Sequence, residues 1–356
     1  MTMLAEITTC VIGVDPDGAR IQVAAIDSAT KGELASESFP NNPDGHDEAM
    51  AWADGFADAG DRAWAVEGSG SYGSRLTRSL QGAGEWVIDF SFPVGPAAPN
   101  GAKSDHLDAI RAGREVLGRT KLVTPRADPD GAHGAIRALT SARSGLVRSR
   151  TALINGLKAT LMAGPEALIA ELEDYSSPQL VKRCTRLRPD PTAGPVCEIA
   201  ATKLALRAQA RAIAELDARI GELTNAMGRH VTHVAPHLLD EPGVGTVNAA
   251  QLLVSWGHPG RIHSQAAWGK LSGTAPIEAT SGQNQTRHRL NRGGDRALNR
   301  AIHSIAICRT RHDPDTRAYL AKKTGQGKTK REARRCLKRY IARHLFRLLE
   351  HPPPTP

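Results

Sequence analysis

Apolar and polar positions divide the first 110 residues into short strands and amphipathic helices. Two apolar runs, residues 8–15 and 19–27, are separated by the turn Asp15-Pro16-Asp17-Gly18, which predicts a β-hairpin. The pattern that follows predicts a strand, then helix, strand, helix, strand and helix, over Leu34–Phe39, 45–59, Arg62–Glu67, Ser74–Ala83, Glu85–Phe90 and the residues after Ser104.

The middle of the chain has a helical repeat instead. Residues 197–229 carry apolar positions at steps of mostly three and four, which indicates a coiled-coil seam, and residues 132–162 carry leucines among many Arg and Ser. Between them, residues 163–196 are proline-rich and less regular. We expect the two repeats to form an antiparallel helical hairpin that projects from the first domain. An ordinary helical core is the alternative interpretation.

The pattern changes again after Leu238. Pro242-Gly243-Val244-Gly245 precedes a predicted helix, Val247–Trp256, and a helix start of this kind offers backbone N–H groups to a phosphate, as in a helix-hairpin-helix element. Alone this is a weak signal, because many loops contain Pro-Gly-x-Gly. A final helix over about 329–349 is predicted to pack on the core along one apolar stripe, Cys336, Leu337, Tyr340, Ile341, Leu345 and Leu348. Residues 349–356 are expected to form a disordered tail.

Four acidic residues stand where a metal site would form. The order β-β-β-α-β-α-β-α is that of a ribonuclease-H-like α/β domain, whose mixed sheet places functional side chains at strand ends. Asp15 and Glu67 each end an apolar run, and Asp105 and Asp108, three apart, share a helix face. Gathered carboxylates repel one another, and Mg²⁺, with Mn²⁺ as the alternative ion, relieves that repulsion.

Each of these acids also has a structural interpretation, because exposed acids at strand ends and helix starts are common. Two further acids nearby, Asp17 in the hairpin turn and Asp27 at the end of the second run, are expected to be structural.

Charge is unevenly distributed along the chain. The net charge is +9, but residues 1–110 hold 6 Lys and Arg against 17 Asp and Glu, whereas residues 261–347 hold 21 against 5. A basic half of this kind favours a polyanionic partner, DNA or RNA, over the alternative of a solvated basic surface. The five scattered cysteines contain no C-x-x-C pair, and no signal peptide or long apolar run is present, so we expect a cytoplasmic protein without membrane contact.

A second group of residues combines a hydroxyl with several cations. Ser281 lies before Gly282 in a loop, and Arg287, Arg289, Arg292 and Arg296 follow. An exposed serine nucleophile beside guanidinium groups that bind phosphate fits this pattern, although a turn in which Ser281 bonds its own backbone is the simpler local interpretation. Lys328 and Lys330 near the last helix are further candidates for nucleic-acid contact, although a flexible basic turn also explains Lys328.

Taken together, these segments resemble the DEDD transposases of the insertion sequence 110 family, which also contains Piv-like DNA invertases. The matching pieces are Gly13-Val14-Asp15, Val66-Glu67-Gly68-Ser69-Gly70, Lys103-Ser104-Asp105-His106-Leu107-Asp108-Ala109, Pro242-Gly243-Val244-Gly245, Gly273-Thr274-Ala275-Pro276 with Thr280-Ser281-Gly282, and Leu290-Asn291-Arg292-Gly293-Gly294-Asp295. They occur in the right order over about residues 8–347. Relatives often carry Ser-Ser-Gly where this chain has Thr280-Ser281-Gly282, which leaves Ser281 as the sole matching serine and makes Thr280 a weaker competitor.

The resemblance implies three regions and a reaction. Residues 1–125 would form a RuvC-like catalytic domain in which Asp15, Glu67, Asp105 and Asp108 bind Mg²⁺. Residues 126–235 would form a helical coiled-coil assembly region, and residues 236–348 a mostly α-helical transposase domain with Ser281 as the nucleophile. In such relatives a non-coding bridge RNA pairs donor and target DNA, and protomers assemble as dimers or tetramers. A protein of this kind works in the prokaryotic cytoplasm, at the nucleoid when DNA-bound.

Two other functions are consistent with the same residues. A RuvC-like structure-specific endonuclease would use the carboxylates with water as the nucleophile, and a non-catalytic nucleic-acid-binding protein would use only the basic surface. An actin-like ATPase also begins with strands and an aspartate, but the sequence lacks the second glycine-rich phosphate loop of that class.

Overall fold

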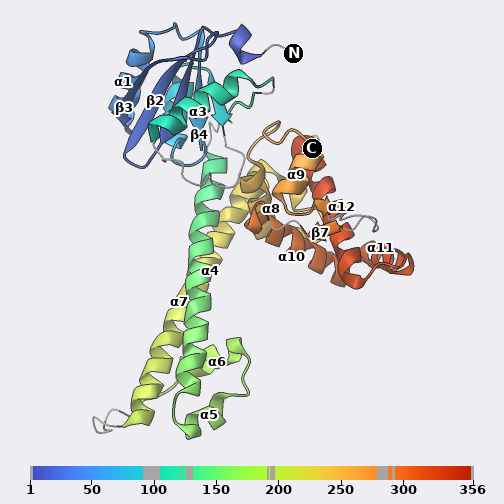
Figure 1. Cartoon of the computed structure of the whole chain (residues 1–356). Helices are drawn as coiled ribbons and strands as arrows, with labels where there is room; N and C mark the ends of the chain where they lie inside the picture. Colours follow the sequence, from blue (N-terminus) through green and yellow to red (C-terminus); the bar gives the residue numbers. More distant parts are fainter. Residues whose placement is uncertain are drawn as a thin grey trace. The chain divides into compact units, whose positions relative to one another are not determined.

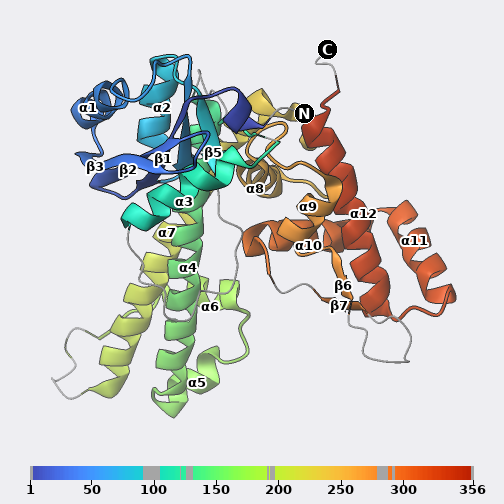
Figure 2. The same ribbon diagram turned by 45° about the horizontal axis from the view of Figure 1, so that its top comes forward.

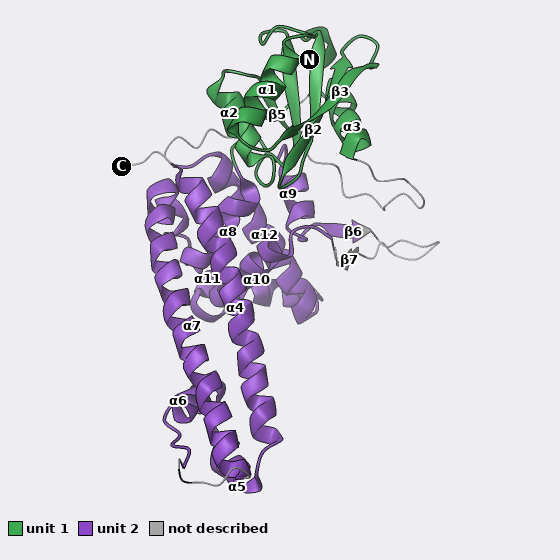
Figure 3. Cartoon of the chain, turned by 90° about the vertical axis from the view of Figure 1, so that its left-hand side faces the viewer, with its two compact units in different colours: residues 1–129, 258–261 green, residues 130–257, 262–356 purple. Residues whose placement is uncertain are grey.

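The computed structural model describes residues 3–90, 105–120, 122–125, 131–190, 192, 197–278, 288–290 and 293–353. The chain forms two compact units, residues 1–129 with 258–261 and residues 130–257 with 262–356 (Figure 3). The prediction of a mixed α/β sheet domain followed by a mostly helical part is confirmed. Within the described residues, no helix is long and apolar enough to cross a membrane.

Unit 1 is a five-stranded sheet with helices on both faces. A short 3-10 turn, Leu4–Glu6, precedes the sheet. The strands lie in the order β3-β2-β1-β4-β5, antiparallel from β3 to β1 and parallel from β1 to β5. The elements are β1 (Cys10–Pro16), β2 (Arg20–Asp27), β3 (Glu33–Pro40), α1 (Pro43–Ala53), β4 (Arg62–Glu67), α2 (Ser74–Gly82), β5 (Val87–Phe90) and α3 (Asp105–Leu117). This is the predicted order of elements; α1 ends earlier than expected, in a turn at Asp54–Phe56.

The two faces of the sheet bury separate cores. Alternate residues of a strand point to opposite faces. Val11, Ala63 and Ile88 therefore pack with α3, and Ile12, Trp64 and Val87 pack with α1 and α2 on the other face. Figure 2 shows α3 on one side of the sheet and α1 and α2 on the other.

The predicted structural roles of Asp17 and Asp27 are confirmed by their hydrogen bonds. The Asp17 carboxylate accepts from the backbone N–H groups of Ala19 and Arg20, each at 2.6 Å, and closes the β1–β2 turn. The Asp27 carboxylate accepts from the N–H and hydroxyl of Thr30 at 2.6 and 2.7 Å. These bonds hold the pKa of both carboxyls below their usual values.

A buried ion pair fixes the start of β4. The Arg62 guanidinium, whose side chain is 2% exposed, bonds Glu85 and Asp54. The Trp64 indole N–H also donates to Glu85, at 2.8 Å. The network explains why an arginine occupies a buried strand position, since every charge in it is paired.

Unit 2 is built on two long antiparallel helices, α4 (Ala132–Met162) and α7 (Glu198–Val234), which lie side by side in Figure 1. Arg143 donates to Thr224 at 2.8 Å, Arg150 pairs with Asp217, and Gln209 donates to Thr160 at 3.2 Å. The residue numbers rise on one helix as they fall on the other, so the predicted antiparallel hairpin is confirmed.

The segment between these helices is more regular than predicted. It contains α5 (Glu166–Leu172) and α6 (Ser177–Cys184). Ser176 and Gln179 form a capping box at the start of α6, a signal that the proline content obscured. Both short helices bury apolar side chains against the end of the hairpin, in a core of Leu157, Leu161, Leu168, Leu172, Leu180, Cys184, Leu206, Ala210 and Ile213.

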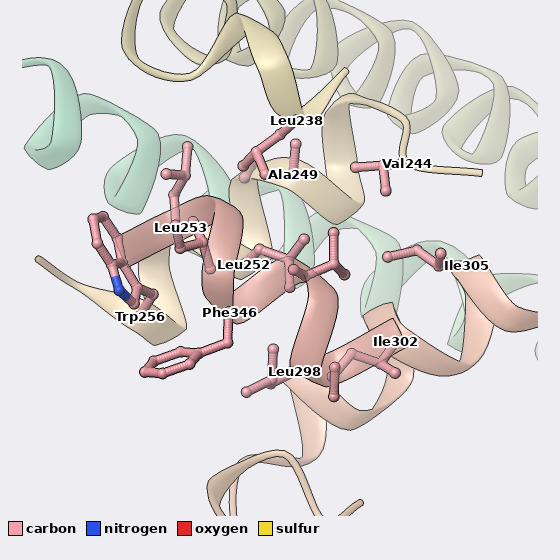
Figure 4. Packing of buried hydrophobic residues seen from close by; sticks show 14 of the residues in the cluster. Leu238, Val244, Ala249, Leu252, Leu253, Trp256, Leu298, Ile302, Ile305 and Phe346 are labelled. Carbon is pink, nitrogen blue, oxygen red and sulfur yellow. The ribbon is translucent and has the colours of Figure 1, made fainter. Parts of the chain in front are cut away.

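The other end of the hairpin joins the C-terminal core. Its remaining elements are η2 (Pro236–Leu238), α8 (Thr246–Trp256), α9 (Gln265–Leu271), β6 (Pro276–Glu278), β7 (His288–Leu290), α10 (Arg296–His312), α11 (Pro314–Gly325) and α12 (Lys330–Glu350). Side chains from α8, α10 and α12 interdigitate (Figure 4), and Ile136 of α4 and Met227 of α7 belong to the same core.

Two details of α12 differ from the prediction. Tyr340 was placed on the apolar stripe, but it is 56% exposed and stacks on Tyr319 of α11 at 6.1 Å between ring centroids. The stripe runs instead through Leu337, Ile341 and Leu345 with Phe346. The helix also continues through Glu350, two residues into the predicted tail, because Leu349 is buried in the core.

Candidate active site

Asp15 and Glu67 lie at matching ends of two adjacent parallel strands. β1 and β4 pair with Val14 opposite Val66, so the next residue of each strand is one of the two acids. On β1, Val11 and Gly13 face α3, and on β4, Ala63 and Ala65 do the same. Because side chains alternate along a strand, Asp15 and Glu67 continue this face. Both are half-buried.

The first turn of α3 brings two more acids to that face. Ala109, Ala112 and Val116 of α3 are buried against the sheet. Asp105 and Asp108 precede this stripe by about one helical turn and extend it. The Asp108 side chain is only 14% exposed and accepts from Arg111 at 3.0 Å. Carboxylates are also favoured at the start of a helix by its dipole.

A glycine contact sets the height of α3 above β1. A Cβ atom added at Gly13 would lie 2.0 Å from the carbonyl oxygen of Ala109 and 2.7 Å from the backbone N of Gly113. A Cβ at Gly113 would lie 2.8 Å from Ile26. The helix and strand backbones therefore touch directly, two residues before Asp15 and one residue after Asp108.

Two contacts to the β2–β3 edge fix the direction of α3. His106 in its first turn hydrogen-bonds Glu33 of β3 at 2.7 Å, and this bond lowers the pKa of Glu33. Arg114 donates to the carbonyl oxygen of Lys31 at 2.9 Å. The helix is thus held at both ends, and with it the two acids of its first turn.

The donor set is chemically suited to a hard divalent cation. Carboxylate oxygens are the protein ligands that Mg²⁺ and Mn²⁺ prefer. Among the described residues, no three His, Cys, Asp or Glu side chains are gathered closely enough to hold an ion. The structure places Asp15 and Glu67 side by side on β1 and β4, and Asp105 and Asp108 in the first turn of the helix that covers the same face of the sheet. Their joint ligation of a metal stays a prediction.

The serine and arginine group lies around a small hairpin of unit 2. β6 and β7 pair antiparallel, with Pro276 opposite Leu290. Ser281 and Arg287 fall between these strands and Arg292 just after them, and all three lie outside the described residues. Arg289 belongs to β7, where the structure describes the backbone but not the side chain.

The other predicted cations lie at helix starts. Arg296 is the exposed first residue of α10, where Asp295 caps the helix by accepting from the N–H groups of Ala297 and Leu298 at 2.8 and 3.0 Å. Lys330 is the first residue of α12, and Lys328 precedes the cap residue Thr329. Lys328 and Lys330 are exposed.

The Pro-Gly-Val-Gly turn is fixed by residues that sequence reasoning did not single out. Arg309 of α10 donates to the carbonyl oxygen of Pro242 at 2.6 Å and pairs with Glu241 at 2.9 Å, and His344 of α12 bonds the same carboxylate at 2.8 Å. Gly243 has a φ of +76°, and a Cβ there would lie 3.1 Å from the carbonyl oxygen of Ile305. The contacts span up to about a hundred residues, so no local pattern could reveal them. A phosphate seat at this turn stays a prediction.

Comparison with known proteins identifies relatives for both units. A family model for DEDD transposases of IS110 elements, described as "Transposase", matches residues 12–163, and one described as "Transposase IS116/IS110/IS902 family" matches residues 235–321. An uncharacterised 43.6 kDa protein of insertion element IS110 from Streptomyces coelicolor is 32% identical over 154 residues, which cover 43% of this chain and 36% of that protein.

A second relative matches most of the chain. It is an uncharacterised 42 kDa protein of insertion element IS900 from Mycobacterium paratuberculosis, 27% identical over 347 residues, with 84% of this chain and 86% of the relative covered. The first family match contains Asp15, Glu67, Asp105 and Asp108, and the second contains Ser281. The protein therefore belongs to the IS110 family of insertion-element transposases.

Proposed function

We propose that this protein is a DNA transposase that cleaves and rejoins DNA strands, with a metal-binding carboxylate set and a serine nucleophile. The observation that carries the proposal is the arrangement of unit 1: Asp15 and Glu67 follow the last paired residues of adjacent parallel strands, and α3, which covers the same face, carries Asp105 and Asp108 in its first turn. Membership in a transposase family supports DNA as the substrate.

The four carboxylates would hold Mg²⁺ or Mn²⁺. When bound, such an ion polarises a phosphate oxygen and neutralises charge that develops during phosphoryl transfer. The protein's own contribution is to fix the ligands: the two strands hold Asp15 and Glu67, and the Gly13–Ala109 contact holds α3. The Asp108 carboxylate accepts from Arg111 at 3.0 Å, which limits its orientation.

Ser281 would act as the nucleophile. Its hydroxyl oxygen forms a bond to phosphorus as a bridging P–O bond of the DNA breaks, and the leaving oxygen gains the proton that the serine loses. The resulting phosphoserine conserves the energy of the broken bond, so rejoining requires no nucleotide hydrolysis. Arg287, Arg289, Arg292 and Arg296 would bind phosphate oxygens beside it.

A non-coding guide RNA would choose the DNA sequences, in which case the protein needs mainly backbone contacts. The excess of Lys and Arg over residues 261–347, 21 against 5 Asp and Glu, supports that role, and we include Lys328 and Lys330 among the contacts. We further propose a homodimer or tetramer assembled through the α4–α7 region.

The first test is strand cleavage and joining by the purified full-length protein with its element's flanking RNA, donor DNA and target DNA. We expect joined strands that depend on a divalent ion and a protein–DNA adduct that survives denaturation. Asp15→Asn should lower the rate at least about 100-fold with DNA affinity nearly unchanged, since it removes one ligand charge but keeps the side-chain shape. Wild-type cleavage by Asp15→Asn would refute the carboxylate assignment.

Ser281→Ala separates the proposal from a RuvC-like nuclease that uses water. Loss of both adduct and cleavage supports the serine nucleophile, whereas full cleavage without an adduct supports hydrolysis. If DNA binds tightly and salt-dependently but no preparation cleaves it, the protein is a non-catalytic nucleic-acid-binding protein.

A further inference from the structure

α12 is rich in Lys and Arg residues, and two of them are half-buried. Residues 330–350 contain eight Lys and Arg but only two Glu. Most of these cations are exposed, but Lys338 and Arg339 are half-buried. Burial lowers the pKa of Lys338, and burial together with Arg343 lowers the pKa of Arg339. A half-buried cation lowers stability unless an anion or a hydrogen-bond acceptor offsets its lost hydration.

The acceptor of Lys338 is a neutral amide. Its ammonium group donates to the side-chain oxygen of Asn299 on α10 at 3.0 Å, and the amide nitrogen of Asn299 donates to the carbonyl oxygen of Ser272 at 2.6 Å. Ser272 is buried, directly after α9 and four residues before β6. The chain therefore holds the ammonium group in one place, at the base of the β6–β7 hairpin.

Two more basic side chains lie near Lys338. His303 lies one turn after Asn299 on α10, and Arg334 lies one turn before Lys338 on α12. The pKa of His303 is lowered first by burial and then by the charges of Lys338 and Arg334, so the three groups are close in space. Figure 2 shows α10, α12 and the β6–β7 hairpin together. Within the described residues, no carboxylate contributes to the pKa shift of Lys338 or His303.

The hydrogen-bonding capacity of the ammonium group is only partly used. A lysine ammonium has three N–H donors, and Asn299 accepts from one of them. Among the described residues no other acceptor is recorded for this ammonium group, so two donors are available there for oxygens of a ligand, beside an exposed guanidinium and an exposed imidazole. Such a group of donors, with no nearby carboxylate, matches a phosphate diester.

We propose that Lys338, Arg334 and His303 form a binding site for a backbone phosphate of the DNA substrate, with Asn299 as the residue that positions Lys338. The choice of DNA rests on the proposed function; the site itself rests on the contacts above. The open face formed by Arg334 and His303 suits a polymer that runs along α12 better than a small enclosed anion.

Salt dependence of DNA binding tests the site with the full-length protein. Each phosphate contact contributes about 0.9 to the slope of log affinity against log salt concentration on duplex DNA. Lys338→Gln should therefore lower the magnitude of the slope by about 1, and its affinity deficit should shrink about 3.5-fold between 50 and 200 mM salt. Asn299→Asp, which sets a carboxylate against Lys338, should act in the same direction, and Lys338→Arg should restore the slope.

Lys158→Gln is the matched control, because it removes the same charge from an exposed position on α4 and should leave the slope within about 0.3 of wild type. Thermal unfolding of each variant confirms that it folds. If Lys338 only stabilises the fold through its hydrogen bond to Asn299, Lys338→Gln should lower the melting temperature and leave the slope unchanged. That result would overturn the proposal. The proposal requires that Lys338→Gln and Asn299→Asp, both folded, each lower the magnitude of the salt slope.

His303 provides a readout that does not involve catalysis. Binding of a phosphate beside it should raise the pKa of its imidazole, followed by NMR with a short duplex and, separately, with inorganic phosphate as the probe. His303→Gln assigns the signal. No rise with the duplex, although the duplex binds, overturns the proposal. Failure of the wild-type protein to bind DNA at all refutes the proposed function instead, and a rise with inorganic phosphate would then still locate the anion site.

Discussion

The contact between Gly13 and α3 makes Gly13→Ala the sharpest test of how the carboxylates are positioned. The added methyl group would lie 2.0 Å from the carbonyl oxygen of Ala109, whereas real contacts of this kind are not shorter than 3.0 Å. α3 must therefore move away from β1 by about 1 Å. The obstacle is backbone on both sides, so no side-chain rotation relieves it.

The displacement should affect catalysis more than folding. Overpacking of this size lowers stability by about 1–3 kcal/mol, which a domain with a buried core on both faces of its sheet tolerates. A displacement of 1 Å in a catalytic group costs roughly 100-fold in rate. We therefore expect Gly13→Ala to fold, to bind DNA with nearly wild-type affinity, and to cleave it about 100-fold more slowly.

Gly82→Ala is the matched control, because a Cβ at Gly82, in the last turn of α2, has no heavy atom within 4 Å. Circular dichroism and urea unfolding establish that both variants fold, and single-turnover cleavage in Mg²⁺ gives their rates. If folded Gly13→Ala cleaves at the rate of Gly82→Ala, the position of α3 does not control the reaction, and the arrangement proposed for Asp105 and Asp108 is wrong.

Three further predictions concern stability and reactivity. Glu85→Gln leaves the buried Arg62 without its main counter-charge and should lower the free energy of unfolding by about 3 kcal/mol in urea titrations. The control Glu115→Gln, at the surface pair with Arg119, should change that free energy by less than about 0.5 kcal/mol. Equal losses for the two variants would contradict the reasoning. Burial raises the pKa of Cys184 to about 11, so iodoacetamide at pH 8 should leave it unmodified in the folded protein, and its contribution to stability should be full below pH 9.0 and lost as pH rises through about 11. Alkylation of native Cys184 at the rate of an unfolded thiol would show that the burial is absent. Gly243→Ala forces a φ of +76° on a residue with a side chain and should lower the free energy of unfolding by about 1–2 kcal/mol. An unchanged midpoint of urea unfolding would contradict this reasoning.

Much of unit 1 follows from short-range patterns. The ends of the apolar runs mark the ends of the strands closely: Asp15 is the next-to-last residue of β1, and Glu67 is the last residue of β4. The spacing of Asp105 and Asp108 fixed a shared helix face, and the turn residues around Asp17 marked the hairpin. Strand ends, helix faces and turns are set by residues that are close together in the sequence. The alternation of apolar and polar positions therefore predicts them.

Local patterns failed where packing decided the outcome. Tyr340 fits the spacing of the apolar stripe, yet it is exposed because α11 offers Tyr319 as a partner outside the core. The proline-rich segment 163–196 folds into α5 and α6 because the end of the α4–α7 pair presents apolar side chains to cover. In both places the tertiary environment outweighs a weak local preference.

The sequence by itself determined which residues end strands, which share a helix face, and where acidic and basic charge gathers. Only the tertiary structure decided that β1 lies beside β4, that α3 touches β1 at Gly13, and that Lys338 lies beside Asn299 and near His303. The physical reason is range: strand and helix periodicity is set within a few residues, whereas these contacts join segments about 35 to 95 positions apart, and only burial of shared apolar surface selects them.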